Sequence, residues 1–314
     1  MLNILLTIDI DSDLFDQSLT TESAGNLKPS WTGLENGVPL ISELFNDYRG
    51  SDGSACKATW FIRADNQIGY YYGDNAYLFT KYQKYWKDLL LKGHELAWHP
   101  HLYKFHNGNW EQELDSDALG NQMNISFKSI PKAWDIKASR IGEAYFSNSI
   151  AHNLRQLGIK IDSTALPGRF RQDEGRTIDW LNTPSKPYFP SEKDYRVPGH
   201  PEIKLLEVPF SMIDVFADYD KKPLKRYTDL SFWHHAVKDG IEKAVQENMI
   251  LNTIIHPSTV IPGILSKPHG LLSFSIDEVK KNLDFILHTA KRKSIEYRFI
   301  TISQVSQINY EKFG

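Results

Sequence analysis

Cysteine is almost absent from the sequence, because the 314 residues contain only one, Cys56. A single cysteine excludes an internal disulfide and a cysteine-based zinc knuckle, and it leaves the redox compartment undecided. Long hydrophobic runs are also lacking, since no apolar stretch approaches the roughly 20 residues that span a bilayer. No basic, signal-like segment precedes the first acidic residue. We therefore expect a cytoplasmic protein without a transmembrane segment.

Basic clusters and two common catalytic motifs are missing as well. The formal net charge is −3 and the isoelectric point is near 6.4. No run of Lys and Arg could follow a phosphate backbone, so no nucleic-acid partner is expected. The sequence contains neither a Gly-x-Ser-x-Gly nucleophile motif nor a glycine-rich phosphate-binding loop. Serine-hydrolase chemistry and phosphate-loop chemistry therefore have little support.

What the sequence does contain is a sustained alternation between strand-like and helix-like segments. Short apolar runs predict buried strands, and the amphipathic stretches between them predict helices. About seven such units favour one parallel sheet covered by helices, in a number typical of barrels. The predicted strands are the opening segment and residues 58–62, 94–99, 138–141, 159–164, 205–210, 249–255 and 296–302, and the predicted helices are residues 38–48, 77–91, 110–130, 146–157, 232–246 and 276–292.

One stretch interrupts this alternation. Residues 165–204 are rich in Pro, Gly, Arg, Asp and Tyr, and they are too many for an ordinary connection between two elements. We predict that they form a loop excursion from the barrel. No repeat or hinge-like linker divides the rest of the chain, so residues 1–314 are predicted to form a single domain.

Carboxylates gather at the end of the opening strand. An apolar run at residues 4–6 leads directly to Asp9, Asp11 and Asp13, and the period of two in a strand would place these three on one side. Like charges so close together repel unless a cation or a shared proton holds them. Metal binding, paired acid–base catalysis, a calcium-type loop and a simple Asp/Ser-rich turn all remain open from this segment alone.

Polar residues also follow the later strands, which is where barrel enzymes place their functional groups. Imidazole together with carboxylate suits zinc, iron, cobalt or nickel better than calcium. Each histidine taken singly could instead stack or hydrogen-bond within its loop. The candidates are His99, His101 and His106 after the third strand, Arg140 and Glu143 after the fourth, Asp162 near the end of the fifth, and His256 after residues 249–255.

Several short motifs occur in order along the chain: Thr7-Ile8-Asp9-Ile10-Asp11, Ala58-Thr59-Trp60-Phe61, Gly93-His94-Glu95-Leu96-Ala97-Trp98-His99, Arg140, Ile161-Asp162-Ser163, Glu207-Val208-Pro209 and Ile254-Ile255-His256. Together they resemble the motifs of the polysaccharide deacetylases, that is, carbohydrate esterase family 4 with its chitooligosaccharide-deacetylase-like members. The resemblance spans most of the chain. It implies an α/β fold of the distorted (β/α)7 TIM-like barrel type and a hydrolase that removes acyl groups from sugars with the help of a divalent metal.

The resemblance also implies catalytic roles for four residues. Asp9 matches the catalytic base of the family, and His256 matches the general acid. Arg140 matches the arginine that orients the base, and Asp162 matches the partner of that arginine or base. Asp13 is left with a role in the loop or behind the site.

The implied metal ligands are less regular. Asp11 matches the metal carboxylate and His99 the first metal imidazole, but the second histidine of the family usually falls four residues later, where this chain has Tyr103. His101 is the nearest substitute, and His106 could serve if its loop folds back. A second departure replaces an expected Arg-x-Pro segment with Arg140-Ile141-Gly142, so the floor of the site is expected to differ.

The sequence therefore predicts a metal-dependent hydrolase that removes an N-acyl group, acetyl or formyl, from a sugar of a cell-surface glycan pathway. The expected cofactor is a divalent metal, Zn²⁺ before other transition metals, and the expected partner is a sugar or glycan substrate. Two alternatives are a catalytically silent carbohydrate-binding protein on a deacetylase scaffold and a hydrolase of small amides. The oligomeric state is not predicted.

Overall fold

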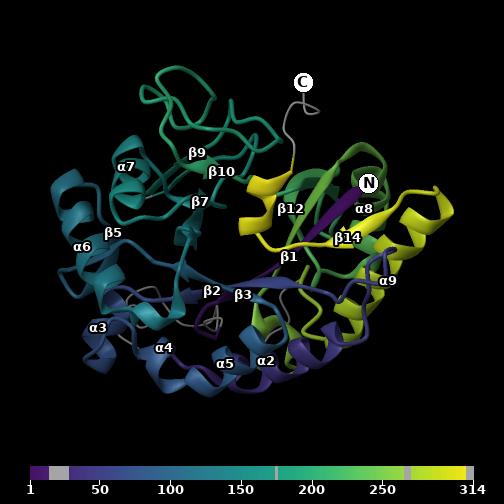
Figure 1. Ribbon diagram of the computed structural model, residues 1–314, viewed down its shortest axis with the longest axis horizontal. Coiled ribbons are helices and arrows are strands. Elements are labelled where there is room, and N and C mark those ends of the chain that lie inside the picture. Colours follow the sequence, from purple (N-terminus) through teal and green to yellow (C-terminus); the bar gives the residue numbers. More distant parts are fainter. Residues whose placement is uncertain (14–27, 174–175, 265–269, 309–314) are drawn as a thin grey trace.

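The computed structural model describes residues 1–13, 28–173, 176–264 and 270–308. Within these residues one large sheet forms the centre, and the helices follow its outer side (Figure 1). No helix of the described ranges is long and apolar enough to cross a membrane. The strands of the large sheet are β1 (Leu2–Ile10), β2 (Ala58–Arg63), β3 (Glu95–His99), β6 (Ala138–Ser139), β7 (Ile161–Asp162), β10 (Leu206–Glu207), β11 (Met212–Val215), β12 (Leu224–Asp229), β13 (Ile250–Ile255) and β14 (Tyr297–Phe299).

The large sheet curls round until its two edges approach each other. Its strand order is β10-β7-β6-β3-β2-β1-β13-β12-β11, with β14 also paired to β1. Neighbours from β10 to β12 run parallel, and β11 is antiparallel to β12. Only residues 208–211 separate β10 at one edge from β11 at the other, so the chain itself joins the two edges. The predicted distorted (β/α)7 TIM-like barrel of the α/β class is thereby confirmed.

The strands of the barrel are buried on both faces, which explains why they read as continuous apolar runs. Along β1, Ile4 and Ile8 pack outward with the helices, while Leu5 points to the inside of the barrel. We call the residues packed around Leu5 the inner apolar cluster. Its buried members are Leu5, Phe61, Ala97, Ala138, Ile161, Leu206, Val208, Ile300, Ile302 and Val305.

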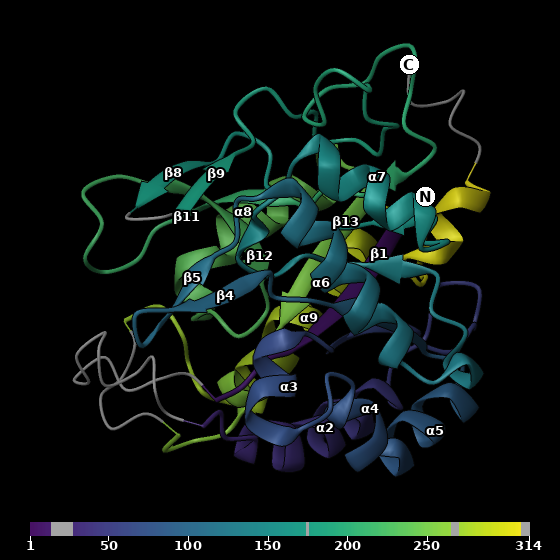
Figure 2. The same ribbon diagram turned by 90° about the vertical axis from the view of Figure 1, so that its left-hand side faces the viewer.

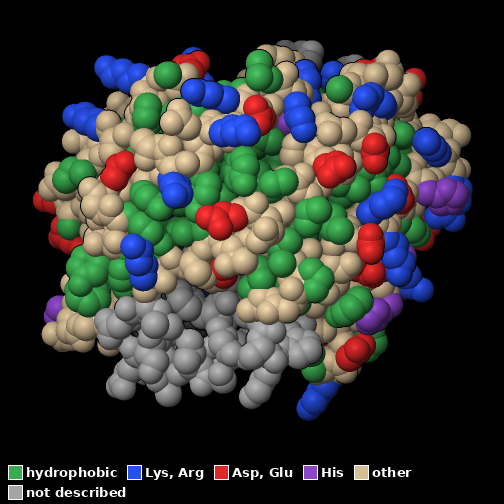
Figure 3. Space-filling model, turned by 90° about the horizontal axis from the view of Figure 1, so that it is seen from below, with side chains coloured by type: hydrophobic (Ala, Val, Ile, Leu, Met, Phe, Trp, Pro, Cys, Tyr) green, Lys and Arg blue, Asp and Glu red, His purple; other side chains and the backbone are tan. Residues whose placement is uncertain are grey.

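The helices form an outer layer that is continuous from α6 through α3, α4, α5 and α2 to α9 in Figure 1. Seen from below that view, hydrophobic side chains form several surface patches between charged ones (Figure 3). Exposed apolar residues of this layer include Leu40 and Leu91. The helices are α2 (Thr32–Phe45), α3 (Asn66–Tyr72), α4 (Tyr77–Lys81), α5 (Gln83–Leu91), α6 (Ser116–Ser129), α7 (Asn148–Gln156), α8 (His234–Glu247) and α9 (Ile276–Arg292).

The predicted start of the first helix is wrong. The helix was predicted over residues 38–48, but α2 begins at Thr32 and Pro39 lies inside it. Gly37 instead lets the helix approach another segment, because a Cβ there would lie 2.3 Å from the Pro257 carbonyl oxygen. The helix is capped from a distance: Asp13 accepts hydrogen bonds from the backbone N–H groups of Thr32 and Gly33. This gives Asp13 a structural role behind the site.

Two other predicted helices are also corrected. The segment 110–130 begins as strand β5 (Asn109–Gln112), which pairs with β4 (Tyr103–His106) in an antiparallel hairpin, and α6 starts only at Ser116. The segment 77–91 divides at Tyr82 into α4 and α5. The predicted excursion contains a second hairpin, β8 (Phe170–Asp173) with β9 (Arg176–Asp179). The polar composition of residues 14–28 predicts a loop after the opening strand, and except for Lys28 these residues lie outside the part of the chain that the structure describes.

Candidate active site

A cavity of about 550 Å³ opens at the end of the barrel where the parallel strands finish. Its lining includes Asp11 after β1, His99 at the end of β3, Arg140 after β6 and His256 after β13. In Figure 2 the hairpins β4–β5 and β8–β9 both lie on the left side of the molecule, together with β11. The residues predicted from the ends of the strands are thus brought into one place, as expected for a barrel.

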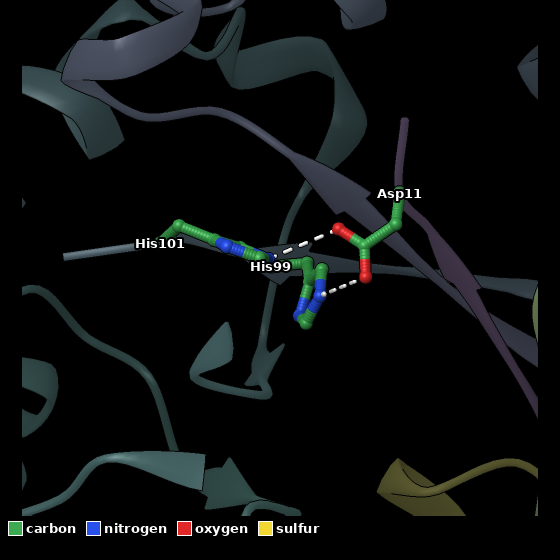
Figure 4. Close-up of side chains that lie close together, drawn as sticks. All are labelled: Asp11, His99 and His101. Carbon is green, nitrogen blue, oxygen red and sulfur yellow. Dashed lines mark ion pairs between the residues drawn. The ribbon is translucent and has the colours of Figure 1, made fainter. Parts of the chain in front are cut away.

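Asp11, His99 and His101 form a compact cluster at this mouth (Figure 4). The Nε2 atom of His101 lies 3.0 Å from Asp11 Oδ1, and Nε2 of His99 lies 3.5 Å from Asp11 Oδ2. One ligand atom from each of the three residues lies within 4.8 Å of the other two. Ligands around a tetrahedral Zn²⁺ lie about 3.4 Å apart, so the spacing of the cluster fits a small divalent cation.

The hydrogen bonds around the cluster favour the same conclusion. Among the residues that the structure describes, the buried atoms Asp11 Oδ1, His99 Nε2 and His101 Nε2 have no hydrogen-bond partner of suitable geometry, although they face one another. The Nδ1 atom of His99 is 2.7 Å from the carbonyl oxygen of Arg140, which can only accept, so Nδ1 carries the proton. In the neutral ring the lone pair then lies on Nε2, which faces the cluster. One carboxylate and two imidazoles with open positions suit a catalytic Zn²⁺.

The charged groups of the cluster shift one another's pKa values. Burial raises the pKa of Asp11, but the charges of His101 and His99 outweigh it and hold that pKa well below its ordinary value. Burial lowers the pKa of His99, but the carboxylates of Asp9 and Asp11 raise it overall. A cation between these groups would take the place of the proton on His99, so binding of a metal would release protons.

Gly142 makes room for His101. A Cβ at position 142 would lie 2.2 Å from Cδ2 and 2.4 Å from Nε2 of His101, which no side chain tolerates. The Gly142 N–H also donates to the Pro100 carbonyl oxygen at 2.9 Å, and this fixes the backbone beside the ligand. The two departures from the family pattern, a histidine ligand at position 101 and a glycine at position 142, therefore lie in direct contact. The imidazole at 101 occupies the volume that any side chain at 142 would need.

The structure also separates His101 from the other candidate, His106. His106 lies at the end of β4 with its side chain 59% exposed, and its Nδ1 faces Glu111 Oε2 at 3.6 Å. It is not part of the described cluster. Tyr103, at the position where a histidine was expected, packs its ring against His101 with 5.5 Å between ring centroids. Tyr103 thus supports the neighbouring imidazole.

Arg140 holds Asp9 at the base of the mouth. Its Nη1 donates to Asp9 Oδ1 at 2.7 Å and to Thr7 Oγ1 at 2.8 Å. The guanidinium carbon lies 4.1 Å from the ring centroids of both Phe61 and Phe210, so the planar group is stacked between two aromatic faces. The second carboxylate oxygen of Asp9 lies 3.9 Å from His99 Nε2. Asp9 is therefore fixed by one oxygen and presents the other to the metal cluster.

Asp162 lies close to this arrangement but does not contact the arginine. It accepts from Ser139 Oγ at 2.6 Å and from the Thr164 N–H at 3.0 Å. The side chain of Arg140 is held instead by Ser163, whose carbonyl oxygen accepts at 2.8 Å and whose hydroxyl accepts at 3.0 Å. Burial raises the pKa of Asp162. Its role as the partner in catalysis stays a prediction, and any action on Asp9 would pass through residue 163.

Glu207 lies beside Asp162. Its Oε1 accepts from the N–H groups of Thr164 and Ala165. Burial and the charge of Asp162 raise the pKa of Glu207 well above its ordinary value. A neutral Glu207 next to an ionised Asp162 relieves the repulsion between two buried carboxylates. The pair fixes the backbone that holds Arg140.

His256 faces the cluster from the opposite wall. Its Nε2 lies 3.8 Å from Asp11 Oδ2, and its Nδ1 lies 3.8 Å from Asp229 Oδ2. Burial lowers the pKa of His256, but Asp229 and the nearby carboxylates raise it overall, to about 9. The other oxygen of Asp229 accepts from the N–H and the hydroxyl of Ser231. The imidazole is thus favoured in its protonated form, in position to donate a proton.

Sequence reasoning missed two residues of this site. Asp229 ends β12, a strand that was not predicted, although the run Tyr227-Thr228-Asp229 follows the same pattern of a strand that ends in a carboxylate. Arg63 ends β2, lies 4.0 Å from Asp11 Oδ1, and is paired with Asp65 at 2.9 Å. Asp65 also accepts from the backbone N–H of His101. Arg63 and Asp65 thus support two residues of the cluster from behind.

No protein-family model matches the chain, and no curated protein matches it. Among solved structures, a provisionally assigned polysaccharide deacetylase from Mycobacterium smegmatis is 15% identical, with a TM-score of 0.46, over 97% of this chain and 89% of that one. A 4-alpha-glucanotransferase from Thermococcus litoralis is 13% identical, with a TM-score of 0.48, over 98% of this chain and 39% of that one. A family 4 carbohydrate esterase from Streptomyces lividans, in complex with acetate, is 10% identical, with a TM-score of 0.37, over 94% and 91%.

Two of these three structures are described as members of the family that the sequence resembles. The TM-scores lie below 0.5 and the identities at 15% or less, so the likeness carries no weight for function.

Proposed function

We propose that the chain is a metal-dependent hydrolase that removes an N-acyl group, acetyl or formyl, from a sugar of a cell-surface glycan pathway. The observation that carries the proposal is the convergence of three functions at one mouth. The cluster of Asp11, His99 and His101 leaves three buried atoms without partners, and both Asp9 and His256 lie within 4 Å of its atoms. A cytoplasmic location belongs to the same proposal and rests on the sequence alone.

Asp11, His99 and His101 would hold the metal through one carboxylate oxygen and two Nε2 atoms. When bound, a divalent metal such as Zn²⁺ would polarise the acyl carbonyl oxygen and lower the pKa of a water molecule. The protein contributes the orientation of the ligands. The Arg140 carbonyl oxygen fixes the ring of His99, and Gly142 leaves the space that His101 fills.

Asp9 is placed to act as the general base. Arg140 holds Oδ1 of Asp9 and fixes the side-chain rotamer, while Oδ2 remains directed toward the cluster. That oxygen would accept the proton of the attacking water. Arg140 is buried and stacked between two rings, so the carboxylate cannot swing away from its position during the reaction.

His256 is placed to act as the general acid. An amine leaves an amide only when it receives a proton, and the raised pKa of His256 keeps a proton on the ring at neutral pH. Asp229 faces Nδ1 and stabilises the charged ring, so Nε2 is the nitrogen that donates into the cavity. The base and the acid thus face the cluster from different strands, β1 and β13.

The test combines metal analysis with a hydrolysis assay. Purified protein is expected to contain about one divalent metal per chain and to release acetate or formate from N-acylated amino sugars. Asp11→Asn keeps the shape of the side chain but removes its charge, and it should lose both properties. Asp135→Asn, at a carboxylate that is 75% exposed outside the cavity, should keep both. The proposal would be refuted if wild type and Asp11→Asn alike bound no metal and released no acyl group.

The alternative of a catalytically silent sugar-binding barrel rests on Tyr103 at a position where a ligand was expected. Because His101 supplies the second imidazole of the cluster, Tyr103 no longer gives a reason to expect a protein without a metal site. Glycan binding that survives removal of the metal, with no hydrolysis at any metal concentration, would favour the silent barrel. Hydrolysis of small amides but of no sugar amide would favour the third prediction, a small-amide hydrolase.

A further inference from the structure

One cation of the cavity has no role in the chemistry described above. Arg169 lines the same cavity as Asp11 and His256, and its side chain is exposed to that space. No carboxylate of the residues that the structure describes forms an ion pair with it. Two other arginines of the cavity have their charge balanced by a carboxylate. Arg140 binds Asp9, and Arg226 binds Asp220 through two parallel hydrogen bonds of 2.8 and 2.9 Å.

The position of Arg169 is set by the second hairpin of the mouth. It directly precedes β8, which pairs with β9 in an antiparallel hairpin, and its carbonyl oxygen accepts from the Trp180 N–H at 2.8 Å. Side chains two apart in such a segment share a face, so Arg171 is directed the same way, and both residues line the cavity. Phe170 between them is 49% exposed on the other face.

The electrostatics of the cavity agree with this placement. Burial raises the pKa of Tyr227, and the positive charge of Arg169 is one of the influences that oppose the rise. The guanidinium therefore lies close enough to act on a phenol of the cavity wall. The carboxylates of the cavity are directed elsewhere: Asp9 binds Arg140, Asp229 binds Ser231, Asp11 faces the two imidazoles of the metal cluster, and Glu143 also has an interaction of its own. The charge of Arg169 is left for a ligand.

We propose that the substrate carries an anionic group, a phosphate or a carboxylate, that Arg169 binds at the mouth of the cavity, with Arg171 on the same face. This inference rests on the proposed function and names the class of sugar on which it acts. A guanidinium presents a planar fork of donors that matches a phosphate or carboxylate with two parallel hydrogen bonds. A cation in a cleft also raises the local concentration of an anionic substrate.

The test compares three N-acetylated sugars that differ in charge: N-acetylglucosamine, N-acetylglucosamine 1-phosphate and N-acetylmuramic acid. Binding is measured by calorimetry on the metal-loaded protein, and hydrolysis is followed separately by acetate release. We expect at least one charged sugar to bind tenfold or more tightly than the neutral one. Preference for the phosphate alone or for the carboxylate alone identifies which anion the site takes. Equal affinity for all three would overturn the inference and leave Arg169 as a solvated cation.

Variants locate the effect at this residue. Arg169→Gln should abolish the preference for the charged sugar, and Arg169→Lys should keep part of it because the charge remains without the fork. Arg292→Gln removes an arginine on the outer helix α9 and should leave the preference intact. A preference that survives in Arg169→Gln would overturn the assignment. Because binding is read without turnover, absent hydrolysis would count against the proposed function alone, whereas hydrolysis without a preference for anions would count against this inference alone.

Discussion

The two halves of the barrel interior are built by the same strands but differ in their side chains, which are mainly apolar in the lower half and charged in the upper half. Leu5, Thr7 and Asp9 alternate along the inner face of β1. Leu5 packs into the inner apolar cluster, and Asp9 lies at the other end of the same face. In the lower half ten buried apolar side chains form the inner apolar cluster, and the buried polar side chain of Asn252 beside Leu5 is hydrogen-bonded through its amide nitrogen to Ser163 and backbone carbonyls, whereas the upper half holds Asp9, Arg140 and the cluster of Asp11 with its histidines. A period of two places both sets inside the barrel.

The difference separates stability from chemistry. Burial of the apolar half removes nonpolar surface from water, which is the main source of folding free energy. The polar half keeps charges and unpartnered nitrogen atoms away from water, which opposes folding unless each charge has a partner. Substitutions in the lower half should therefore change the free energy of unfolding, and substitutions in the upper half should change metal binding and turnover. Four measurements test this contrast.

The largest effect is expected at Asp9. Asp9→Asn should lower the rate of acyl release by about 10²- to 10⁴-fold, because the proposed general base is lost, while the metal content stays unchanged. It should also lower the free energy of unfolding by about 3–5 kcal/mol, because Arg140 is left as a buried cation without its partner. Urea unfolding of the double variant Asp9→Asn with Arg140→Met should recover most of that stability without recovering activity. A stable but inactive single variant would show that the pair contributes nothing to folding.

A change in the lower half should have the opposite profile. Leu5→Ala removes a fully buried side chain from the inner apolar cluster and should lower the free energy of unfolding by about 2–5 kcal/mol. Zinc affinity and the rate of acyl release, measured on the folded fraction, should stay within twofold. Leu90→Ala, at a leucine that is 40% exposed, serves as the matched control and should change stability by less than about 0.5 kcal/mol. Loss of zinc affinity in Leu5→Ala would mean that the two halves are coupled.

Gly142 tests how tightly the upper half is packed. Gly142→Ala places a methyl group where the His101 ring lies, so the ring must move and zinc affinity should fall about 10- to 100-fold. Competition with a chelator measures this affinity. In a His101→Ala background the same change should have no further effect, because the ring that it displaces is gone. Additive effects of the two changes would refute the proposed contact.

The smallest effect concerns a histidine outside the barrel interior, in apolar surroundings. His94 accepts a hydrogen bond from the Ala58 N–H and packs near Phe45 and Trp60, and burial lowers its pKa to about 4. The unfolded chain gains the proton near pH 6.5 and the folded chain only near pH 4. Stability is therefore present above pH 6.5 and falls as the pH drops toward 4, by about 1–2 kcal/mol between pH 7 and pH 5.

Urea unfolding of wild type and His94→Gln at pH 7 and pH 5 isolates this contribution. The difference between the two proteins should shrink at pH 5. A constant difference across that range would show that His94 does not titrate as expected. The contrast with His99, whose pKa the carboxylates of Asp9 and Asp11 raise, would then lose its basis.

Local periodicity was enough to find most of the strands and helices. The predicted helix 276–292 coincides with α9, and the predicted strand 249–255 differs from β13 by one residue. In both cases the pattern of buried positions is written in consecutive residues. Elements whose limits depend on distant residues were misplaced. The start of α2 requires Asp13, and the strand at residues 109–112 requires β4 as its partner.

The site shows the same division between features set by local sequence and features set by contacts between distant residues. The sequence placed Asp9, Asp11, His99 and His256 at or next to the ends of their strands, because alternation and chain order fix which residues reach the mouth of a parallel barrel. It did not determine which histidine joins Asp11. That choice was made by the β4–β5 hairpin, which turns His106 toward Glu111, and by Gly142, which leaves space for the ring of His101. Packing between segments far apart in the chain has no periodic signature, so only the tertiary structure could show it.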